Sequence, residues 1–308
     1  METVNCILCG SSSYKYVFDA FDLKISKRWF SIVMCDCGLV FTNPRPTKED
    51  ISNYYGNKYY SYKPYKHKRL KISSCSNPLK ILDIGCGSGK WLYKQKILGH
   101  DCYGIEISKE ASDIANQLGL NVYCRDIEDI KENVFKENFF DIIRMNHVFE
   151  HVYNPVSVLK KVNRILHPSG KILLKVPNFD ALERLFFNNC YRSLDVPRHL
   201  YHFNIESLLK IIDKCNLIIK KADNQNFPSC SFSEVINFMK CQYSTLKLVN
   251  LDLRHKKSSP EIYHALEGVL KYSIFSYKLW SHRILRENNP KTMSTLYLHL
   301  MKKLPSVD

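Results

Sequence analysis

From position 80 onward, short apolar runs alternate with stretches in which apolar residues recur at helical spacing. This alternation predicts a parallel β-sheet with helices packed on both faces. Sheets of that kind bind ligands beyond the carboxyl ends of their strands. The predicted strands span residues 80–85, 101–107, 121–125, 139–146, 170–176 and 217–222.

The first predicted strand ends in a glycine-rich turn, Asp83-Ile-Gly85-Cys-Gly87-Ser-Gly89. Alternate glycines let the backbone turn sharply and approach a ligand closely, and they leave amides at the start of the next helix available to it. The dinucleotide fingerprint would place its third glycine where this chain has Lys90, and Asp83 would repel a pyrophosphate. The turn therefore favours S-adenosylmethionine, which carries an ammonium and a sulfonium, over a nicotinamide cofactor.

Acidic residues lie at the ends of the next two predicted strands. Glu106 lies about 20 residues beyond the glycines, where a carboxylate can accept both hydroxyls of a ribose. Asp126 follows the third strand, where it can accept a hydrogen bond from an adenine amino group. Acids at strand ends often only cap helices, so each is a weak signal alone. In this order, and together with Asp83, they indicate a nucleoside-containing ligand.

The first 46 residues contain two close pairs of cysteines, Cys6-Ile-Leu-Cys9 and Cys35-Asp-Cys37, each followed by glycine. Four thiolates are a typical ligand set for a tetrahedral structural zinc ion, and such glycines allow turns whose amides point at the sulfurs. The alternative is four buried cysteines that cluster without a metal. We expect a zinc ribbon whose ion stabilises the module and takes no part in chemistry.

A proline-rich exit, Asn43-Pro44-Arg45-Pro46, marks a boundary because proline restricts itself and the residue before it. We therefore divide the chain into a zinc ribbon at 1–46, a tyrosine-rich linker at 47–73 and a large domain at 74–308. Two roles remain open for the linker: its tyrosines either cap a cationic cofactor as a lid or attach the small module to the large one. The tyrosines considered for the lid are Tyr59, Tyr60 and Tyr62.

The composition says more about the cellular compartment of the protein than about its function. The chain has 308 residues, 45% of them hydrophobic, and no stretch approaches the roughly 18 uncharged apolar residues of a membrane span. No basic start followed by an apolar run is visible, so we expect a cytoplasmic protein whose 12 cysteines bind metal or stay reduced. The net charge of +15 would suit nucleic acid, an anionic membrane surface or an acidic substrate. Its lysines are scattered, however, and form no long basic block.

Several phrases of the sequence resemble class I S-adenosylmethionine-dependent methyltransferases, and more narrowly those with an N-terminal zinc ribbon that occur in bacterial sugar and surface-polysaccharide pathways. The resemblance covers most of residues 1–228 and implies a Rossmann-like sheet of seven strands. The seventh strand would be 296–302, after a mostly helical insertion at 229–290. The phrases that carry the resemblance are residues 37–46, 83–89, 146–152, 168–171, 176–178 and 195–203.

By the same resemblance, one set of residues is expected to hold S-adenosylmethionine. Asp83 and the glycines would hold its amino-acid part, Glu106 its ribose, and Asp126 with Ile127 its adenine. Glu150 and His151 are expected to shape the pocket on the methionine side. The full set is Asp83, Gly85, Gly87, Gly89, Glu106, Ile107, Asp126, Ile127, Asn146 and His151.

Two histidines are candidates for proton removal. Methyl transfer from a sulfonium is an in-line displacement, and a hydroxyl or carbon acceptor benefits from a base. His199 and His202 lie in one polar loop after the fifth strand, on the ligand side of the sheet. A lone histidine is more often structural, whereas two in one loop favour a role for at least one of them. Nearby, Arg144 and Lys175 interrupt buried strands, so we expect them to point outward or to form ion pairs. The less favoured alternative is that they present positive charge to an anionic acceptor such as a nucleotide-linked sugar.

Three functions remain open. The first is a methyltransferase that acts on a small molecule or glycan, with O- or C-methylation of a sugar as the expected reaction. The second is an RNA methyltransferase that uses the ribbon and the positive charge, although the Asn/Asp-Pro-Pro-aromatic signature of base-amino methyltransferases is absent after the fourth strand. The third is a binding protein that kept the cofactor fold without catalysis. In the insertion, the basic and apolar segment 266–286 suggests core packing first, and contact with a membrane surface or a partner subunit second.

Overall fold

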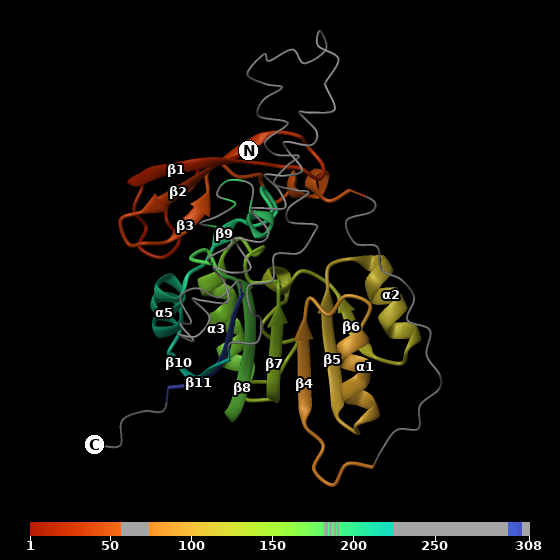
Figure 1. Ribbon diagram of the computed structural model, residues 1–308. Helices are drawn as coiled ribbons and strands as arrows, with labels where there is room; N and C mark the ends of the chain where they lie inside the picture. Colours follow the sequence, from red (N-terminus) through yellow and green to blue (C-terminus); the bar gives the residue numbers. More distant parts are fainter. Residues whose placement is uncertain are drawn as a thin grey trace, which may run out of the picture.

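The computed structural model describes residues 1–56, 74–181, 184, 187, 189, 191–223 and 295–303. The larger of its two sheets has seven strands in the order β10-β11-β8-β7-β4-β5-β6 (Figure 1). Within this sheet only β11 runs antiparallel to its neighbours. The predicted methyltransferase sheet is thus confirmed, including the seventh strand. Its strands are β4 (Lys80–Ile84), β5 (Asp101–Glu106), β6 (Asn121–Cys124), β7 (Phe140–Asn146), β8 (Leu166–Pro177), β10 (Leu217–Asp223) and β11 (Thr295–Lys302).

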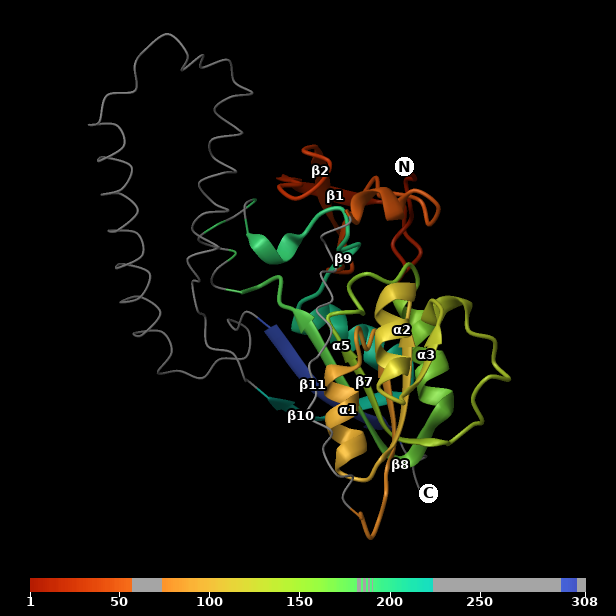
Figure 2. The same ribbon diagram turned by 90° about the vertical axis from the view of Figure 1, so that its right-hand side faces the viewer.

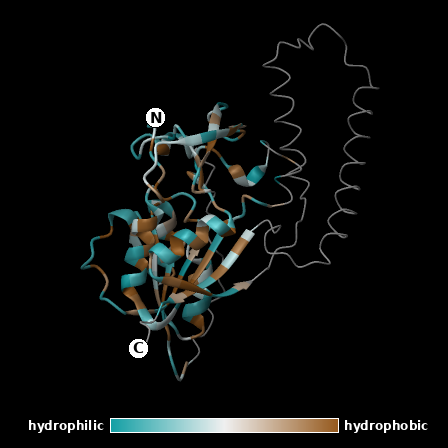
Figure 3. Cartoon of the chain, turned by 90° about the vertical axis from the view of Figure 1, so that its left-hand side faces the viewer, coloured by the Kyte–Doolittle hydropathy of each residue, from teal (hydrophilic) through white to brown (hydrophobic). Residues whose placement is uncertain are grey.

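Helices cover both faces of this sheet (Figure 2). Successive side chains of a strand point to opposite faces. Along β4, Ile81 packs with Leu92 of α1, whereas Leu82 belongs to the core that includes Leu159 of α3. In Figure 3 the strands are therefore mostly brown, while the helices carry both colours. The helices are α1 (Lys90–Ile97), α2 (Lys109–Gln117), α3 (Pro155–Ile165) and α5 (Ile205–Lys214), with short 3-10 turns η1 (Ile51–Tyr54), η2 (Ile127–Asp129) and η4 (Arg192–Leu194).

A second, smaller sheet lies above the carboxyl ends of the parallel strands (Figure 1). Its order is β1-β2-β3-β9, with β1 (Tyr14–Phe21), β2 (Trp29–Cys35), β3 (Val40–Thr42) and β9 (Tyr201–His202). The last of these strands belongs to the later part of the chain: Val40 pairs with His202, and Phe41 pairs with Tyr201. The small sheet is therefore completed by the segment that follows His199.

The buried side chain of Arg198 connects three separate parts of the chain in the same region. The Nη2 atom of Arg198 lies 2.8 Å from Asp22 Oδ1 and 2.9 Å from Asp195 Oδ1, and Nη1 donates to the carbonyl of Tyr54 at 2.9 Å. The side chains of Arg198 and Asp22 are 1% and 0% exposed. Since a buried charge is costly without a partner, this network fixes the loop of His199 against the N-terminal residues.

Two sequence predictions fall outside the described residues: the lid tyrosines Tyr59, Tyr60 and Tyr62, and the insertion at 229–290. Both stay predictions. Within the described ranges, no helix has the length and apolar character that a bilayer crossing requires.

Candidate functional site

The glycine turn after β4 has a backbone conformation that favours glycine at three positions. Gly85, Gly87 and Gly89 have φ values of +68°, +56° and +75°, a region that side chains with a Cβ disfavour. A Cβ on Gly85 would lie 2.3 Å from Val148 Cγ2, and one on Gly89 would lie 2.5 Å from Leu120 Cδ1. The turn therefore brings its backbone close to the segment after β7, at the carboxyl edge of the sheet.

Asp83, just before the turn, is paired with Arg144. The two residues are in register on neighbouring strands, and Arg144 Nη1 lies 3.0 Å from both carboxylate oxygens. The guanidinium also lies over the Trp91 ring, with its Cζ 4.5 Å from the ring centroid. Burial raises the pKa of Asp83 to about 6, although Arg144 favours the charged form. The predicted pairing of Arg144 is present, and the negative charge of Asp83 is balanced from within the protein.

Glu106 connects the end of β5 to the glycine turn. Its Oε2 accepts a hydrogen bond from the Gly87 amide at 2.8 Å, and its Oε1 accepts one from the Ser108 amide at 2.9 Å. Burial raises the pKa of Glu106, and the backbone amides of Ser108 and Gly87 act in the opposite direction. Ile107 beside it is 64% exposed, which is high for a large apolar residue. The pair offers a carboxylate and an apolar surface at one point of the edge.

Asp126 caps the short turn η2 and also meets a residue that the sequence did not single out. Its Oδ1 accepts a hydrogen bond from the Glu128 amide at 2.9 Å, as the capping alternative predicts. Its Oδ2 lies 3.3 Å from Lys48 Nζ, which also contacts Asp129 Oδ1 at 2.7 Å. Ile127 is buried at 5% exposure. Lys48 thus ties the residues after the ribbon to the expected adenine end of the site.

Glu150, His151 and His199 form a compact group beside the end of β7. The rings of His151 and His199 lie 4.6 Å apart, and His199 Nε2 is 3.9 Å from Glu150 Oε1. A fourth side chain, His147, brings Nδ1 within 3.2 Å of the same carboxylate oxygen. Burial raises the pKa of Glu150, but the hydrogen bond to His147 and the nearby imidazoles outweigh it and lower that pKa. Burial lowers the pKa of His199 to about 4, so its ring is neutral near pH 7.

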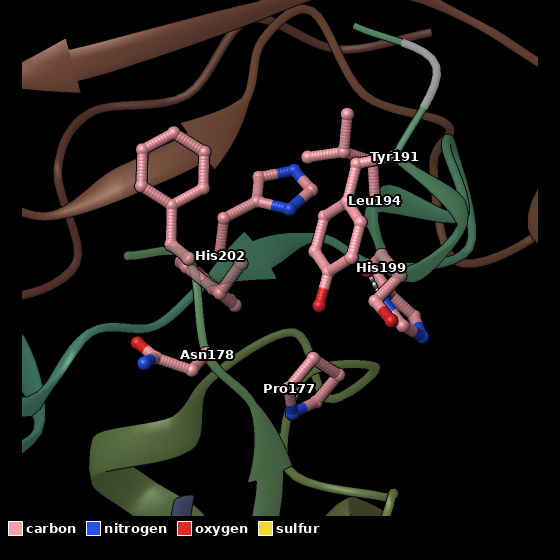
Figure 4. Close-up of a pocket in the computed structure, with 9 residues that line it drawn as sticks. Pro177, Asn178, Tyr191, Leu194, His199 and His202 are labelled. Carbon is pink, nitrogen blue, oxygen red and sulfur yellow. Dashed lines mark hydrogen bonds between the residues drawn. The ribbon is translucent and has the colours of Figure 1, made fainter. Parts of the chain in front are cut away.

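His202 is more enclosed than His199. Its Nε2 lies 3.1 Å from Thr42 Oγ1, and burial lowers its pKa to about 3. Both imidazole rings line the small cavity drawn in Figure 4. The cavity volume is about 10 Å³, which is the room of about one water molecule. His202 therefore has an evident structural role in joining β9 to β3.

The four N-terminal cysteines come together as the sequence predicts, with all four sulfurs within 4.8 Å of one another. The Cys6 and Cys37 sulfurs are 3.5 Å apart, and those of Cys9 and Cys35 are 3.4 Å apart. Tetrahedral zinc with bonds of about 2.3 Å places its sulfurs about 3.8 Å apart, so the set fits zinc after a slight expansion. The hydrogen bond from the Ser11 amide lowers the pKa of Cys9 to about 7, and amides also reach the sulfurs of Cys6 and Cys35. The geometry is that of a zinc-ribbon-like module.

A family model described as a methyltransferase domain matches residues 57–220, which is more than half of the chain. The chain belongs to this methyltransferase family. The predicted class I S-adenosylmethionine-dependent methyltransferase is thereby confirmed as a family assignment.

Relatives of this methyltransferase match a shorter stretch. The ubiquinone biosynthesis O-methyltransferase of Coxiella burnetii (strain RSA 493 / Nine Mile phase I) is 31% identical over 121 residues, 36% of this chain and 50% of the relative. The enzyme of the same name from Photobacterium profundum is 31% identical over 113 residues, 35% of this chain and 47% of the relative. The chain spans about half the length of the curated relatives that it matches.

Solved structures with a similar course of the chain include two archaeal proteins. An S-adenosylmethionine-dependent methyltransferase from Archaeoglobus fulgidus has a TM-score of 0.45 and 18% identity, with 73% of this chain and 87% of the other covered. A putative methyltransferase in complex with the Trm112 activator of Haloferax volcanii has a TM-score of 0.46 and 14% identity, with 77% and 86% covered.

The methyltransferase brings the sequence-predicted cofactor residues to one edge of its sheet. The glycine turn follows β4 and Asp126 follows β6, while Glu106 and Asn146 are the last residues of β5 and β7. Three contacts were not predicted from the sequence. They are the ion pair of Lys48 with Asp126, the ion pairs of Arg198 next to the His199 loop, and the grouping of histidines around Glu150. Lys48 and Arg198 gave no signal because their contacts join distant positions, whereas the Glu150-His151 pair was visible as a motif without its third member.

Proposed function

We propose that this protein is an S-adenosylmethionine-dependent methyltransferase whose acceptor is a small molecule, with a sugar or glycan as the favoured class. The observation that carries the cofactor assignment is the hydrogen bond between Glu106 and Gly87, whereas the acceptor class comes from the sequence resemblance. This hydrogen bond places a carboxylate suited to ribose hydroxyls directly against a glycine turn suited to the amino-acid part of the cofactor.

The residues at the sheet edge match the parts of the cofactor by their chemistry. Arg144, with 19% of its side chain exposed, presents a guanidinium that suits the carboxylate of a zwitterionic amino acid, and the buried Asp83 would hold that guanidinium in place and add negative charge near the ammonium. Glu106 would hold the ribose, Ile107 would cover an adenine face, and Asp126 would accept from the adenine amino group. Asn146 and His151 would line the methionine side. When bound, S-adenosylmethionine supplies an electrophilic methyl group on a sulfonium.

Of the two histidines, His199 suits the role of base better. Its Nδ1 is within 2.8 Å of the Ser193 carbonyl and donates a hydrogen bond to it, so Nε2 keeps a lone pair. Glu150 lies near that nitrogen and would stabilise the imidazolium that forms when an acceptor gives up its proton. His202 instead shares its Nε2 with Thr42 and connects two strands.

We also propose that Cys6, Cys9, Cys35 and Cys37 hold one structural zinc ion. Four protein ligands leave no open position, so the ion would stabilise the ribbon without taking part in methyl transfer. The test is metal analysis of a Cys6→Ser, Cys37→Ser double variant. Loss of one equivalent of zinc is expected, and full retention would refute the assignment.

The cofactor proposal is tested by isothermal titration with S-adenosylhomocysteine and, separately, with NAD. The wild type should bind S-adenosylhomocysteine and not NAD. Glu106→Ala should weaken binding at least tenfold, because hydrogen bonds to a carboxylate contribute about 1.5–3 kcal/mol. Asp101→Asn is the matched control, since Asp101 is an exposed acid at the other end of the same strand. Binding of NAD alone, or equal affinity in the two variants, would refute the proposed site.

The acceptor class is tested with methyl-labelled S-adenosylmethionine and three sets of acceptors: nucleotide-linked sugars, small phenols, and transfer RNA. Transfer of label to a sugar or another small molecule supports the proposal. Label found only in RNA would refute the acceptor class while leaving the cofactor assignment intact. Cofactor binding without transfer to any of the three sets would favour the non-catalytic alternative.

A further inference from the structure

Glu150, His151 and His199 each bring one potential metal-ligand atom into a single group. One ligand atom from each residue lies within 4.8 Å of the other two, and Glu150 and His199 are both buried. Like-signed lone pairs repel at such distances unless a cation lies between them. The arrangement therefore calls for a positive charge at its centre.

The two imidazole rings are fixed with Nε2 available as an acceptor. His199 Nδ1 donates to the Ser193 carbonyl at 2.8 Å, and His151 Nδ1 donates to the Arg198 carbonyl at 2.9 Å, with the Tyr55 hydroxyl 3.2 Å from the same His151 nitrogen. A ring that donates from Nδ1 to a carbonyl carries its lone pair on Nε2 when neutral. This is the usual arrangement of histidines that bind metals, where a carbonyl or carboxylate orients the ring from behind.

The carboxylate supplies an independent observation. Glu150 Oε2 is fully buried and has no hydrogen-bond partner among the residues that the structure describes. Its other oxygen, Oε1, is the one that lies 3.2 Å from His147 Nδ1 and 3.9 Å from His199 Nε2. An unpaired buried carboxylate oxygen costs about 1–3 kcal/mol or more, so a fold that retains one usually satisfies it with an unseen ligand.

We infer that Glu150, His151 and His199 bind a divalent transition-metal ion at the edge of the sheet. Two histidines and one glutamate are a common ligand set for zinc, and two histidines with a carboxylate also hold iron and related ions with open positions. Bonds of about 2.0–2.2 Å place three such ligands roughly 3.3 Å apart, so side-chain shifts of less than about 1 Å would close the group around an ion. This ion is distinct from the one at the four cysteines, which have no open position.

Three protein ligands leave room for an acceptor oxygen. A coordinated hydroxyl has a lowered pKa, loses its proton to water, and presents an alkoxide or phenoxide to the methyl donor. The oxygen–methyl bond then forms as the sulfur–methyl bond breaks. This step rests on the proposed function, and it would replace His199 as the base in the metal-loaded protein. It also narrows the acceptor to compounds with a hydroxyl that can coordinate a metal, such as vicinal diols.

The test uses the full chain with zinc on its cysteines and adds Mn²⁺, because thiolates bind Mn²⁺ poorly while imidazole and carboxylate ligands accept it. Electron paramagnetic resonance of free Mn²⁺ measures the bound fraction. We expect one ion per chain. The dissociation constant should rise at least tenfold in Glu150→Gln and in His199→Gln. His167→Gln, a histidine at the start of β8 outside this group, should bind as the wild type does.

Two outcomes would overturn the inference. The first is no Mn²⁺ uptake by the wild type, which would mean that the group shares only a proton. The second is equal Mn²⁺ uptake by the wild type and all three variants. S-adenosylhomocysteine binding is measured on the same samples. If it persists in Glu150→Gln while Mn²⁺ binding is lost, the fold is intact and the loss belongs to the metal site. If Mn²⁺ binds normally but S-adenosylhomocysteine never does, the proposed function fails and the metal site stands.

Discussion

Replacing Arg144 with methionine should destabilise the protein in a pH-dependent way. The change removes the only cation that the structure places against both oxygens of Asp83 among the described residues. The Asp83 side chain is 0% exposed, so its charged form would be left buried without compensation. The native state of the variant would instead take up a proton on Asp83.

The size of the effect follows from the pKa. A carboxyl group whose pKa rises on folding makes the folded protein less stable as pH increases from the ordinary pKa to the folded pKa. For Asp83 this interval runs from 3.8 to about 6. Without Arg144 the folded pKa rises further, so above pH 6 the variant carries a proton that the wild type has released. Each pH unit then costs the variant about 1.4 kcal/mol relative to the wild type. We expect a loss of about 1.4 kcal/mol at pH 7 and about 2.7 kcal/mol at pH 8 from this cause.

A smaller, pH-independent loss accompanies it, because Arg144 also lies over the Trp91 ring and such contacts contribute about 0.5–2 kcal/mol. Urea unfolding at pH 6, 7 and 8 in the presence of zinc separates the two contributions. The double variant Asp83→Asn, Arg144→Met should lose the pH dependence, since it has no buried carboxyl group. A stability difference that stays constant from pH 6 to 8, or a double variant with the same slope as Arg144→Met, would refute the buried pair.

Three further predictions follow from the described contacts. Gly85→Ala should weaken S-adenosylhomocysteine binding more than tenfold, and adding Val148→Ala should restore part of it because the 2.3 Å clash disappears; calorimetry that finds no rescue would contradict the clash. His199→Ala should lower kcat at least 100-fold with cofactor affinity unchanged, while His202→Ala should mainly lower the melting temperature; the reverse pattern would exchange their roles. Arg198→Met should cost about 3 kcal/mol in unfolding free energy, since it removes the guanidinium that two buried carboxylates share while Asp195 keeps Lys24 and Asp22 keeps its backbone donors; a loss under 1 kcal/mol would show that the network is solvated.

The sequence predicted most of the large sheet because its strands are short apolar runs separated by helical spacing. The glycine turn was also predicted from the sequence. The structure gives one physical reason for its glycines, because a Cβ on Gly85 would clash with Val148. The four cysteines were predicted to cluster because two close pairs in one short module have few other uses, and their sulfurs do lie together.

Other parts of the site could not be predicted from the sequence. The strand β9 has only two residues and therefore no periodicity, so its pairing with β3 could not be predicted from the sequence. The burial of Arg198 depends on Asp22, which lies 176 positions earlier. His151 and His199 were each singled out, but the 4.6 Å between their rings is a product of the fold and not of any motif.

The pairing of β9 with β3 makes the first 46 residues part of the framework that positions His199, the proposed base. His199 lies two positions before β9, and the amide of Thr42 donates to the carbonyl of Leu200 between them at 3.0 Å. Deleting the N-terminal module would leave this loop without its anchor and would misplace His199 even if the large sheet folded unaided. A chimaera that carries a different N-terminal module would stay competent only if the replacement offered an unpaired strand edge at the same height above the sheet.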